Sequence, residues 1–198
     1  GDIKYVDRNG DGVISYEQDR GYVGAAAYPK FVGGLSFSGD WKGIDLSFLF
    51  QAGLGRDVAL TGVYSGGIMD NTQMTKPFYH GGNSPKYLVE NSWREDNTNA
   101  EFPRLSIVQA SSNNAYSSTF WYRSGDYLRL KNLQIGYTFP QKWMSRIGID
   151  RLRIYFEGQN LWTVSELTKF NIDPEQPGVS NGYYPQQRIF SFGVNLAF

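Results

Sequence analysis

The sequence contains no cysteine, so it has neither a disulfide framework nor thiol chemistry. It also has no apolar run approaching the roughly 18 residues of a membrane-spanning helix. Neither sign of charge is in excess, because 19 Lys and Arg residues balance 19 Asp and Glu residues. This balance argues against a nucleic-acid partner and against a disordered acidic tail. Residues 1–4 do not have the pattern of a signal peptide.

Aromatic residues (16%) and glycine (23 residues) are abundant, which favours strands and tight turns. Five segments alternate apolar and polar residues with a period of two, as strands with one apolar face do. These segments are 31–41, 43–51, 127–139, 151–159 and 188–198. The negative mean hydropathy does not exclude a membrane, because strands of membrane barrels alternate lipid-facing and lumen-facing side chains.

Three local features refine this pattern. Asp40 to Gly43 predicts a tight hairpin between the first two segments. The apolar positions of the third segment change phase, which predicts a β-bulge near Lys131 and Asn132. Between the third and fourth segments, residues 143–147 predict one helical turn.

Short and long connections alternate along the chain. The links at 40–43 and 140–150 are short, whereas those at 52–126 and 160–187 are long and rich in Gly, Asn, Ser, Tyr and Pro. Outer-membrane barrels have short periplasmic turns and long extracellular loops. We therefore predict an all-β fold, in which about five C-terminal antiparallel strands belong to a large transmembrane β-barrel. Residues 1–29, 52–126 and 160–187 would be extracellular loops, and the C-terminus would be periplasmic.

A soluble β-sandwich also alternates apolar and polar residues. Two features favour the barrel. The polar faces carry Arg151, Arg153 and Glu157, and charged side chains suit a wet lumen. Alternatively, these side chains pair with one another or with a plug. Aromatic residues also gather at strand ends, as in the girdles of barrels: Phe31, Trp41, Tyr127, Phe139, Trp162 and Phe198. The rival interpretation is a soluble, secreted β-rich carbohydrate-binding module.

Several segments, in order and spacing, resemble the C-terminal quarter of the SusC/RagA family of TonB-linked outer-membrane proteins. They are residues 1–5 with 7–12, 43–47, 97–105, 125–132, 152–155 with 158–161, and 184–185 leading to 190–195. The resemblance implies a plugged barrel that imports oligosaccharides or peptides with a SusD-like surface lipoprotein, energised by the TonB complex. Such large plugged barrels have about 22 strands. The N-terminal plug is absent from this sequence, so the chain is expected to be part of a larger barrel.

Residues 7–12 match the first half of a calcium loop, D-x-[DN]-x-[DN]-G, which places oxygen ligands at alternate positions before a sharp turn. The twelfth position is Gln18 rather than Glu, and an acidic residue follows one position later. The predicted Ca²⁺ ligands are Asp7, Asn9, Asp11, Val13 and Asp19. The alternative is an Asn-Gly/Asp-Gly surface turn that binds no ion.

The final segment carries an unbroken apolar stripe that ends in an aromatic residue. Its members are Phe190, Phe192, Val194, Leu196 and Phe198. The barrel assembly machinery would pair with such a strand through main-chain hydrogen bonds, so the stripe is predicted to be an assembly signal. The alternative is an ordinary strand that faces lipid.

Aromatic residues in or near the longest loop are candidates for stacking on a sugar or peptide substrate. They are Trp93, Tyr116, Phe120, Trp121 and Tyr122. Alternatively, they pack a small core of the loop or contact a lid protein. The one histidine, His80, has no neighbouring nucleophile motif, and no phosphate-binding glycine motif is present. The sequence therefore predicts transport without catalysis.

Overall fold

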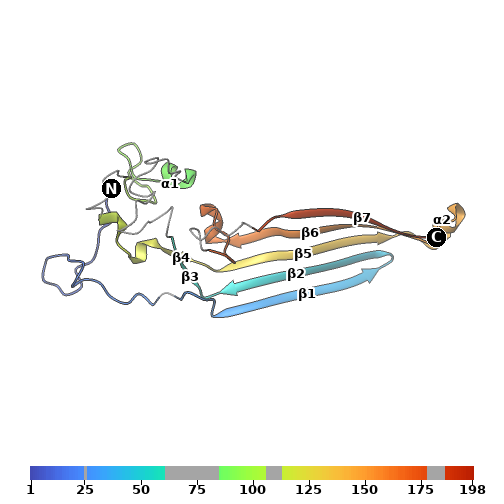
Figure 1. Cartoon of the computed structure of the whole chain (residues 1–198), viewed down its shortest axis with the longest axis horizontal. Coiled ribbons are helices and arrows are strands. Elements are labelled where there is room, and N and C mark those ends of the chain that lie inside the picture. The colour runs from blue at the N-terminus through green and yellow to red at the C-terminus, as the bar shows by residue number, and fades with distance from the viewer. Residues whose placement is uncertain (25, 61–84, 106–112, 178–185) are drawn as a thin grey trace.

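The computed structural model describes residues 1–24, 26–60, 85–105, 113–177 and 186–198. Its main feature is an open antiparallel sheet in the order β1-β2-β5-β6-β7 (Figure 1). The strands are β1 (Phe31–Trp41), β2 (Ile44–Leu54), β5 (Tyr127–Thr138), β6 (Arg151–Ser165) and β7 (Ile189–Ala197). The five predicted strands are confirmed, and β6 continues beyond its predicted end at residue 159. None of the described helices is long and apolar enough to cross a membrane.

The hairpin between β1 and β2 closes with a two-residue turn at Lys42 and Gly43. Both residues have positive φ, 50° and 87°, which is the backbone geometry of a type I′ turn. A Cβ atom on Gly43 would also lie 2.6 Å from the carbonyl oxygen of Thr138 on β5. Glycine is therefore required here by its conformation and by the close approach of the neighbouring strand.

The predicted bulge in β5 is confirmed. The register with β2 shifts between Leu49 and Phe50, which leaves Lys131 of β5 without a partner on that strand. The register with β6 shifts at the same level, where Asn160 has a φ of 51°. The extra residue restores the phase, so both halves of β5 present their apolar residues to the same face of the sheet.

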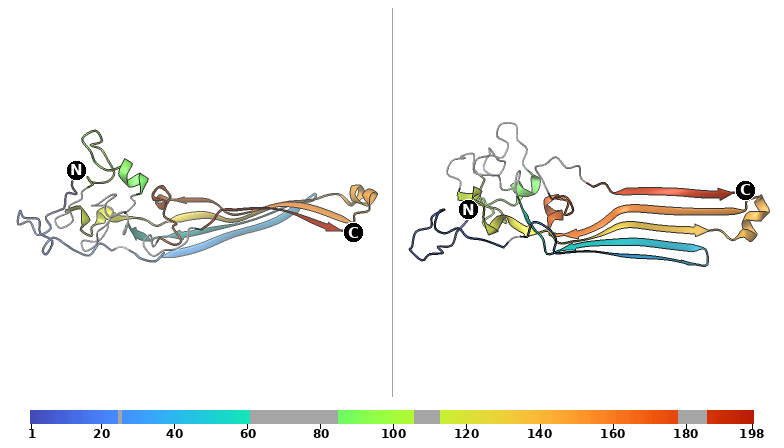
Figure 2. Two further views of the ribbon diagram at one scale, coloured as in Figure 1. Left: turned by 45° about the horizontal axis from the view of Figure 1, so that its top comes forward. Right: turned by 60° about the horizontal axis from the view of Figure 1, so that its bottom comes forward.

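The two faces of the sheet differ in chemistry, because the register aligns residues of one kind across the strands. Apolar rows on one face are Phe37, Phe48, Leu133 and Phe190; Leu46, Ile135, Phe156 and Phe192; and Trp41, Ile44, Tyr137, Ile154 and Val194. A row on the opposite face is Ser38, Ser47, Gln134, Glu157 and Ser191. Figure 2 shows the sheet as a single long layer, and apolar residues such as Leu35 (66%) and Phe192 (82%) are largely exposed.

The loops gather at one end of the sheet, which we call the head. It contains the short sheet of β3 (Asp57–Ala59) and β4 (Tyr122–Ser124), helix α1 (Lys86–Glu90) and three 3-10 helices, η2 (Asn113–Ala115), η3 (Thr119–Trp121) and η5 (Glu166–Phe170). β3, α1, η3, η5 and the segments around them contribute to a small core, which consists of Val58, Leu60, Leu88, Phe102, Trp121, Leu167, Phe170 and Ile172. The long connections are therefore packed against one another around apolar side chains of their own.

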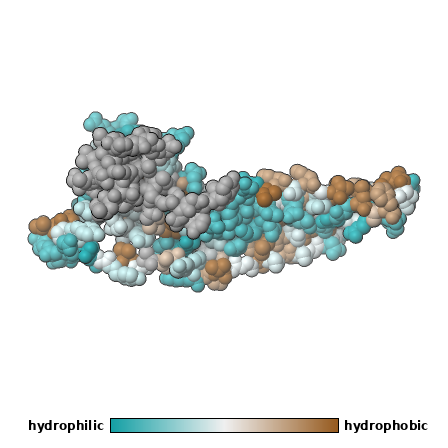
Figure 3. All heavy atoms as spheres, viewed as in Figure 1, coloured by the Kyte–Doolittle hydropathy of each residue, from teal (hydrophilic) through white to brown (hydrophobic). Residues whose placement is uncertain are grey.

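The opposite end, which we call the turn end, holds the β1–β2 turn, the β5–β6 connection and the end of β7 (Figure 1). The predicted helical turn in the β5–β6 connection is confirmed as α2 (Gln141–Met144) followed by η4 (Ser145–Ile147). In the view of Figure 3, hydrophobic residues gather at this end.

Candidate functional site

The polar face carries an ion pair that bridges three strands. Nε and Nη2 of Arg153 on β6 donate to the two carboxylate oxygens of Asp45 on β2, at 2.9 and 2.5 Å. Gly136 lies between them on β5, and a Cβ atom there would come within 2.6 Å of both partners. The missing side chain therefore leaves the space in which the pair forms. The carboxylate partner of Arg153 is therefore Asp45 and not Glu157. Pairing of this face with a plug stays a prediction.

A second charged cluster lies at the head end of the polar face. Arg129 is only 4% exposed and forms ion pairs with Asp173 at 3.0 Å and Glu175 at 2.8 Å. Its guanidinium also donates to Thr163 and Gln186. The Nζ atom of Lys131, the bulged residue, contacts Glu175 at 3.1 Å. The cluster thus ties the segment after η5 to β5 and β6.

The sequence alone does not reveal this cluster. Its only signals are the two basic residues around the bulge and the two closely spaced acidic residues of the loop after β6. The partners Arg129 and Asp173 are 44 positions apart, and nothing in the local pattern connects them.

The N-terminal segment and η2 are joined by hydrogen bonds at the head. The Ile3 N–H donates to the side-chain oxygen of Asn114 at 2.8 Å, and the Tyr5 hydroxyl donates to the Asn113 carbonyl at 2.7 Å. Asp2 accepts from Arg104 at 2.7 and 3.1 Å and from Asn114 at 2.9 Å. The hydrogen bonds from Arg104 and Asn114 hold the pKa of Asp2 below its ordinary value.

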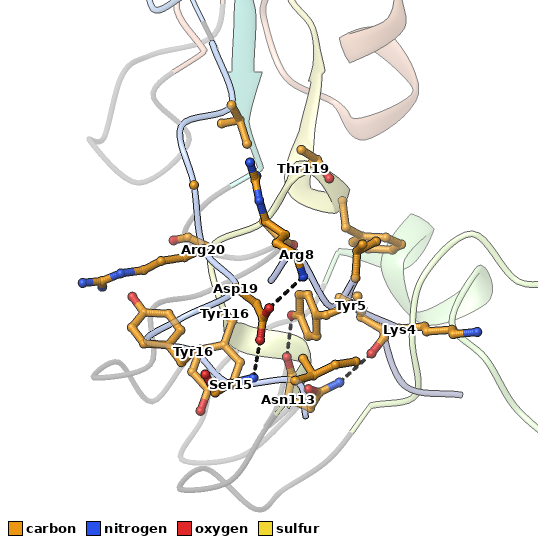
Figure 4. A pocket seen from close by; sticks show the side chains of 18 residues that line it. Lys4, Tyr5, Arg8, Ser15, Tyr16, Asp19, Arg20, Asn113, Tyr116 and Thr119 are labelled. Carbon is orange, nitrogen blue, oxygen red and sulfur yellow. Dashed lines mark hydrogen bonds between the residues drawn. The ribbon is translucent and has the colours of Figure 1, made fainter. Parts of the chain in front are cut away.

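A cavity of about 840 Å³ opens between these two segments (Figure 4). Tyr16 and Tyr116 stack on one side of it with ring centroids 5.0 Å apart, and Tyr5 meets Tyr116 edge-on at 6.3 Å. Burial raises the pKa of the Tyr5 hydroxyl. The side chains of Lys4 and Arg20 point away from the cavity in this view. We call this aromatic cavity the head cleft.

The calcium-like loop forms another part of the head cleft. Asp7 accepts the N–H groups of Gly10 and Gly12 at 2.7 and 2.8 Å, as expected of a tight turn around the first ligand position. Asp19 closes the loop, since it accepts the Arg8 N–H at 2.7 Å and the Ser15 N–H at 2.6 Å. The bonds from Ser15 and then Arg8 lower the pKa of Asp19.

Three of the predicted metal ligands therefore use carboxylate or amide oxygens to accept backbone N–H groups within the loop: Asp7, Asn9 and Asp11. Across the described residues, no three acidic or histidine side chains converge as a metal-binding group. Val13 lies directly after the turn, with its N–H donated to Asp11. Calcium binding stays a prediction. Asp19 is the acidic residue whose carboxylate contacts the start of the loop, at the Arg8 N–H.

The predicted substrate-contact residues fall into different environments. Tyr116 lines the head cleft together with Phe120. Trp121 is 2% exposed in the head core, and its indole N–H donates to the Asn114 carbonyl at 3.0 Å, so its ring is used for packing. Tyr122 lies in β4, and Trp93 is partly buried. His80 lies outside the described residues.

The predicted assembly stripe lies on β7, which pairs with β6 alone among the described strands. The side chains of Phe190, Phe192, Val194, Leu196 and Phe198 are all more than half exposed. Its role as a signal stays a prediction.

The open antiparallel sheet, with one apolar and one polar face and its loops at one end, defines the chain as a portion of a large β-barrel wall. No family model matches the sequence. TonB-dependent receptor P3 of Formosa agariphila is 29% identical over 207 residues, which cover 98% of this chain and 19% of the receptor. TonB-dependent receptor SusC of Bacteroides thetaiotaomicron is 26% identical over 197 residues, covering 98% of this chain and 17% of the receptor.

Among solved structures, the RagAB peptide importer in its "open-open" state matches with a TM-score of 0.63 and 26% identity, covering 98% of this chain and 20% of that chain. These similarities confirm the resemblance to the SusC/RagA family of TonB-linked proteins. The chain spans about a fifth of the length of the curated relatives it matches.

Proposed function

We propose that the chain forms part of the wall of a SusC-like, TonB-dependent outer-membrane importer of oligosaccharides or peptides. The observation that carries this proposal is the two-faced sheet, with apolar rows on one face and polar, ion-paired rows on the other. In the complete barrel the apolar rows would face lipid and the polar rows would face a wet lumen. Three of its strands, β1, β2 and β5, have 11, 11 and 12 residues, close to the roughly 9–11 residues that a tilted strand needs to cross a bilayer.

In this proposal the head is extracellular and the turn end is periplasmic. The head would meet the substrate and a SusD-like surface lipoprotein, while the TonB complex would act through the plug of the complete protein. The barrel assembly machinery would insert the strands, and no covalent chemistry takes place. The soluble carbohydrate-binding module is not favoured, because a soluble sheet would leave its apolar rows in water.

A matched pair of substitutions in the middle of β1 tests the barrel. Phe37 belongs to an apolar row and Ser38 to a polar row, and both are exposed. In the complete protein, Phe37→Lys should destabilise the barrel by about 2–4 kcal/mol, the cost of a lysine at the bilayer midplane, whereas Ser38→Lys should be tolerated. Outer-membrane fractionation and heat-modifiable mobility on gels would measure folded barrel. Equal tolerance of both lysines, with the protein soluble without detergent, would refute the proposal.

The head cleft offers a test of substrate contact. Tyr116→Ala removes a ring of the cleft, whereas Tyr28→Ala removes a ring that is 82% exposed and not part of the cleft. Uptake of labelled oligosaccharide and peptide pools should fall with Tyr116→Ala and remain normal with Tyr28→Ala, and the pool that is affected identifies the substrate class. Unchanged uptake of both pools would remove the cleft from the transport path.

A further inference from the structure

The turn end concentrates basic side chains that have no carboxylate partner. Lys42 lies in the β1–β2 turn, Lys142 in α2 and Arg146 in η4, and all three are exposed. Among the described residues, none of the three takes part in an ion pair. Their charges are therefore available to a partner outside the described chain.

Several cations of the head are paired with carboxylates. Lys86 pairs with Glu90, Arg104 with Asp2, and Lys169 with Glu101, at 3.5, 2.7 and 2.9 Å. The head also carries Lys4, Arg8 and Arg20, which are exposed and in no ion pair among the described residues, so the turn end is distinguished by the position of its cations where the strands of the apolar face end.

Exposed apolar side chains stand beside the unpaired cations. Trp41, Trp143 and Ile147 are 67%, 55% and 66% exposed. Trp41 is the last apolar residue of β1. The Nζ atom of Lys42 lies 4.6 Å from the centroid of the Trp41 ring. Tryptophan next to lysine at the limit of an apolar face is the combination found where a protein passes from lipid chains to headgroups.

The acidic side chains nearby do not neutralise this surface. Asp40 and Asp45 share a row on the polar face, and Asp45 is bound to Arg153 there. Asp150 is exposed beside Arg151, which lies on the polar face at the start of β6. The turn end therefore combines exposed aromatic rings with positive charge.

We propose that this surface, the turn-end patch (Trp41, Lys42, Lys142, Trp143, Arg146 and Ile147), binds the phosphate headgroups of anionic phospholipids in the adjacent leaflet. The inference rests on the proposed barrel and goes beyond it, because a barrel can insert without any headgroup preference. Each basic residue near an anionic surface contributes about 1 kcal/mol, or roughly a fivefold preference.

The test uses the complete protein in vesicles of equal parts phosphatidylglycerol and phosphatidylcholine, with bromine atoms on the chains of one lipid or the other. Tryptophan fluorescence should be quenched more when the phosphatidylglycerol is brominated. The combined variant Lys42→Gln, Lys142→Gln, Arg146→Gln should lose this excess. The control removes three head cations instead: Lys86→Gln, Arg94→Gln and Arg104→Gln.

Equal quenching by the two lipids in the unaltered protein, or an excess that survives in the turn-end variant, would overturn the headgroup inference. Insertion is scored separately in each sample by heat-modifiable mobility. A protein that inserts without headgroup preference leaves the barrel proposal intact, whereas a protein that does not insert overturns both proposals.

Discussion

Replacing Arg129 by methionine should destabilise the head end of the barrel far more than the loss of a surface ion pair. The guanidinium is 4% exposed and its partners Asp173 and Glu175 are 17% and 15% exposed, so the substitution leaves two carboxylates poorly solvated and without their main cation. Removing one partner of a buried pair costs about 3–5 kcal/mol. Urea unfolding in lipid vesicles, followed by tryptophan fluorescence, measures the change in the free energy of unfolding.

Arg104→Met is the matched control. The side chains of Arg104 and Asp2 are 57% and 43% exposed, and such a pair contributes about 0.2–1 kcal/mol. Adding Asp173→Asn to Arg129→Met should cost little more, because it removes a carboxylate that has already lost its partner. Equal losses for Arg129→Met and Arg104→Met, or full additivity in the double variant, would contradict this reasoning.

Three further predictions concern the termini and the calcium-like loop. Deleting Phe198 from the complete protein should lower the amount of folded barrel in the outer membrane; unchanged amounts would argue against an assembly signal. Calorimetric titration with Ca²⁺ should show binding that Asp19→Asn weakens, and no heat in the unaltered protein would leave the loop as a plain turn. Because the pKa of Asp2 is lowered, its stabilising effect is present above about pH 3.8 and is lost as the pH falls through the lowered value. Arg104→Gln should move this loss to higher pH in an acid titration of tryptophan fluorescence, and an unmoved transition would refute the assignment.

The sheet could be predicted because its signal is local. Alternation with a period of two assigns each residue of a strand to a face, and a change of phase within one segment reveals a bulge without knowledge of its neighbours. The turn at Lys42 and Gly43 could equally be predicted from the sequence, because a short polar link with glycine between alternating segments favours a hairpin.

The site was less predictable because its contacts are long-range. Arg153 reaches Asp45 across 108 positions, and the contact depends on Gly136 in an intervening strand. Trp121 shows a second limit: the sequence leaves open whether an aromatic residue in a loop meets substrate or packs a core of the loop, and the structure places this one in the core. The cleft between the N-terminal segment and Tyr116 likewise forms only when distant segments pack together.

The bulge at Lys131 places one extra residue in β5, which has no partner on β2. Deleting Lys131 would remove the bulge and leave a regular ladder with β2, in which Asn132 still lies opposite Leu49 and Leu130 opposite Phe50. Arg129 and the leucines beside it would keep their faces, and the polar face would lose the contact between Lys131 and Glu175. The bulge thus lets the strand carry one additional charge on its polar face without interrupting the apolar one.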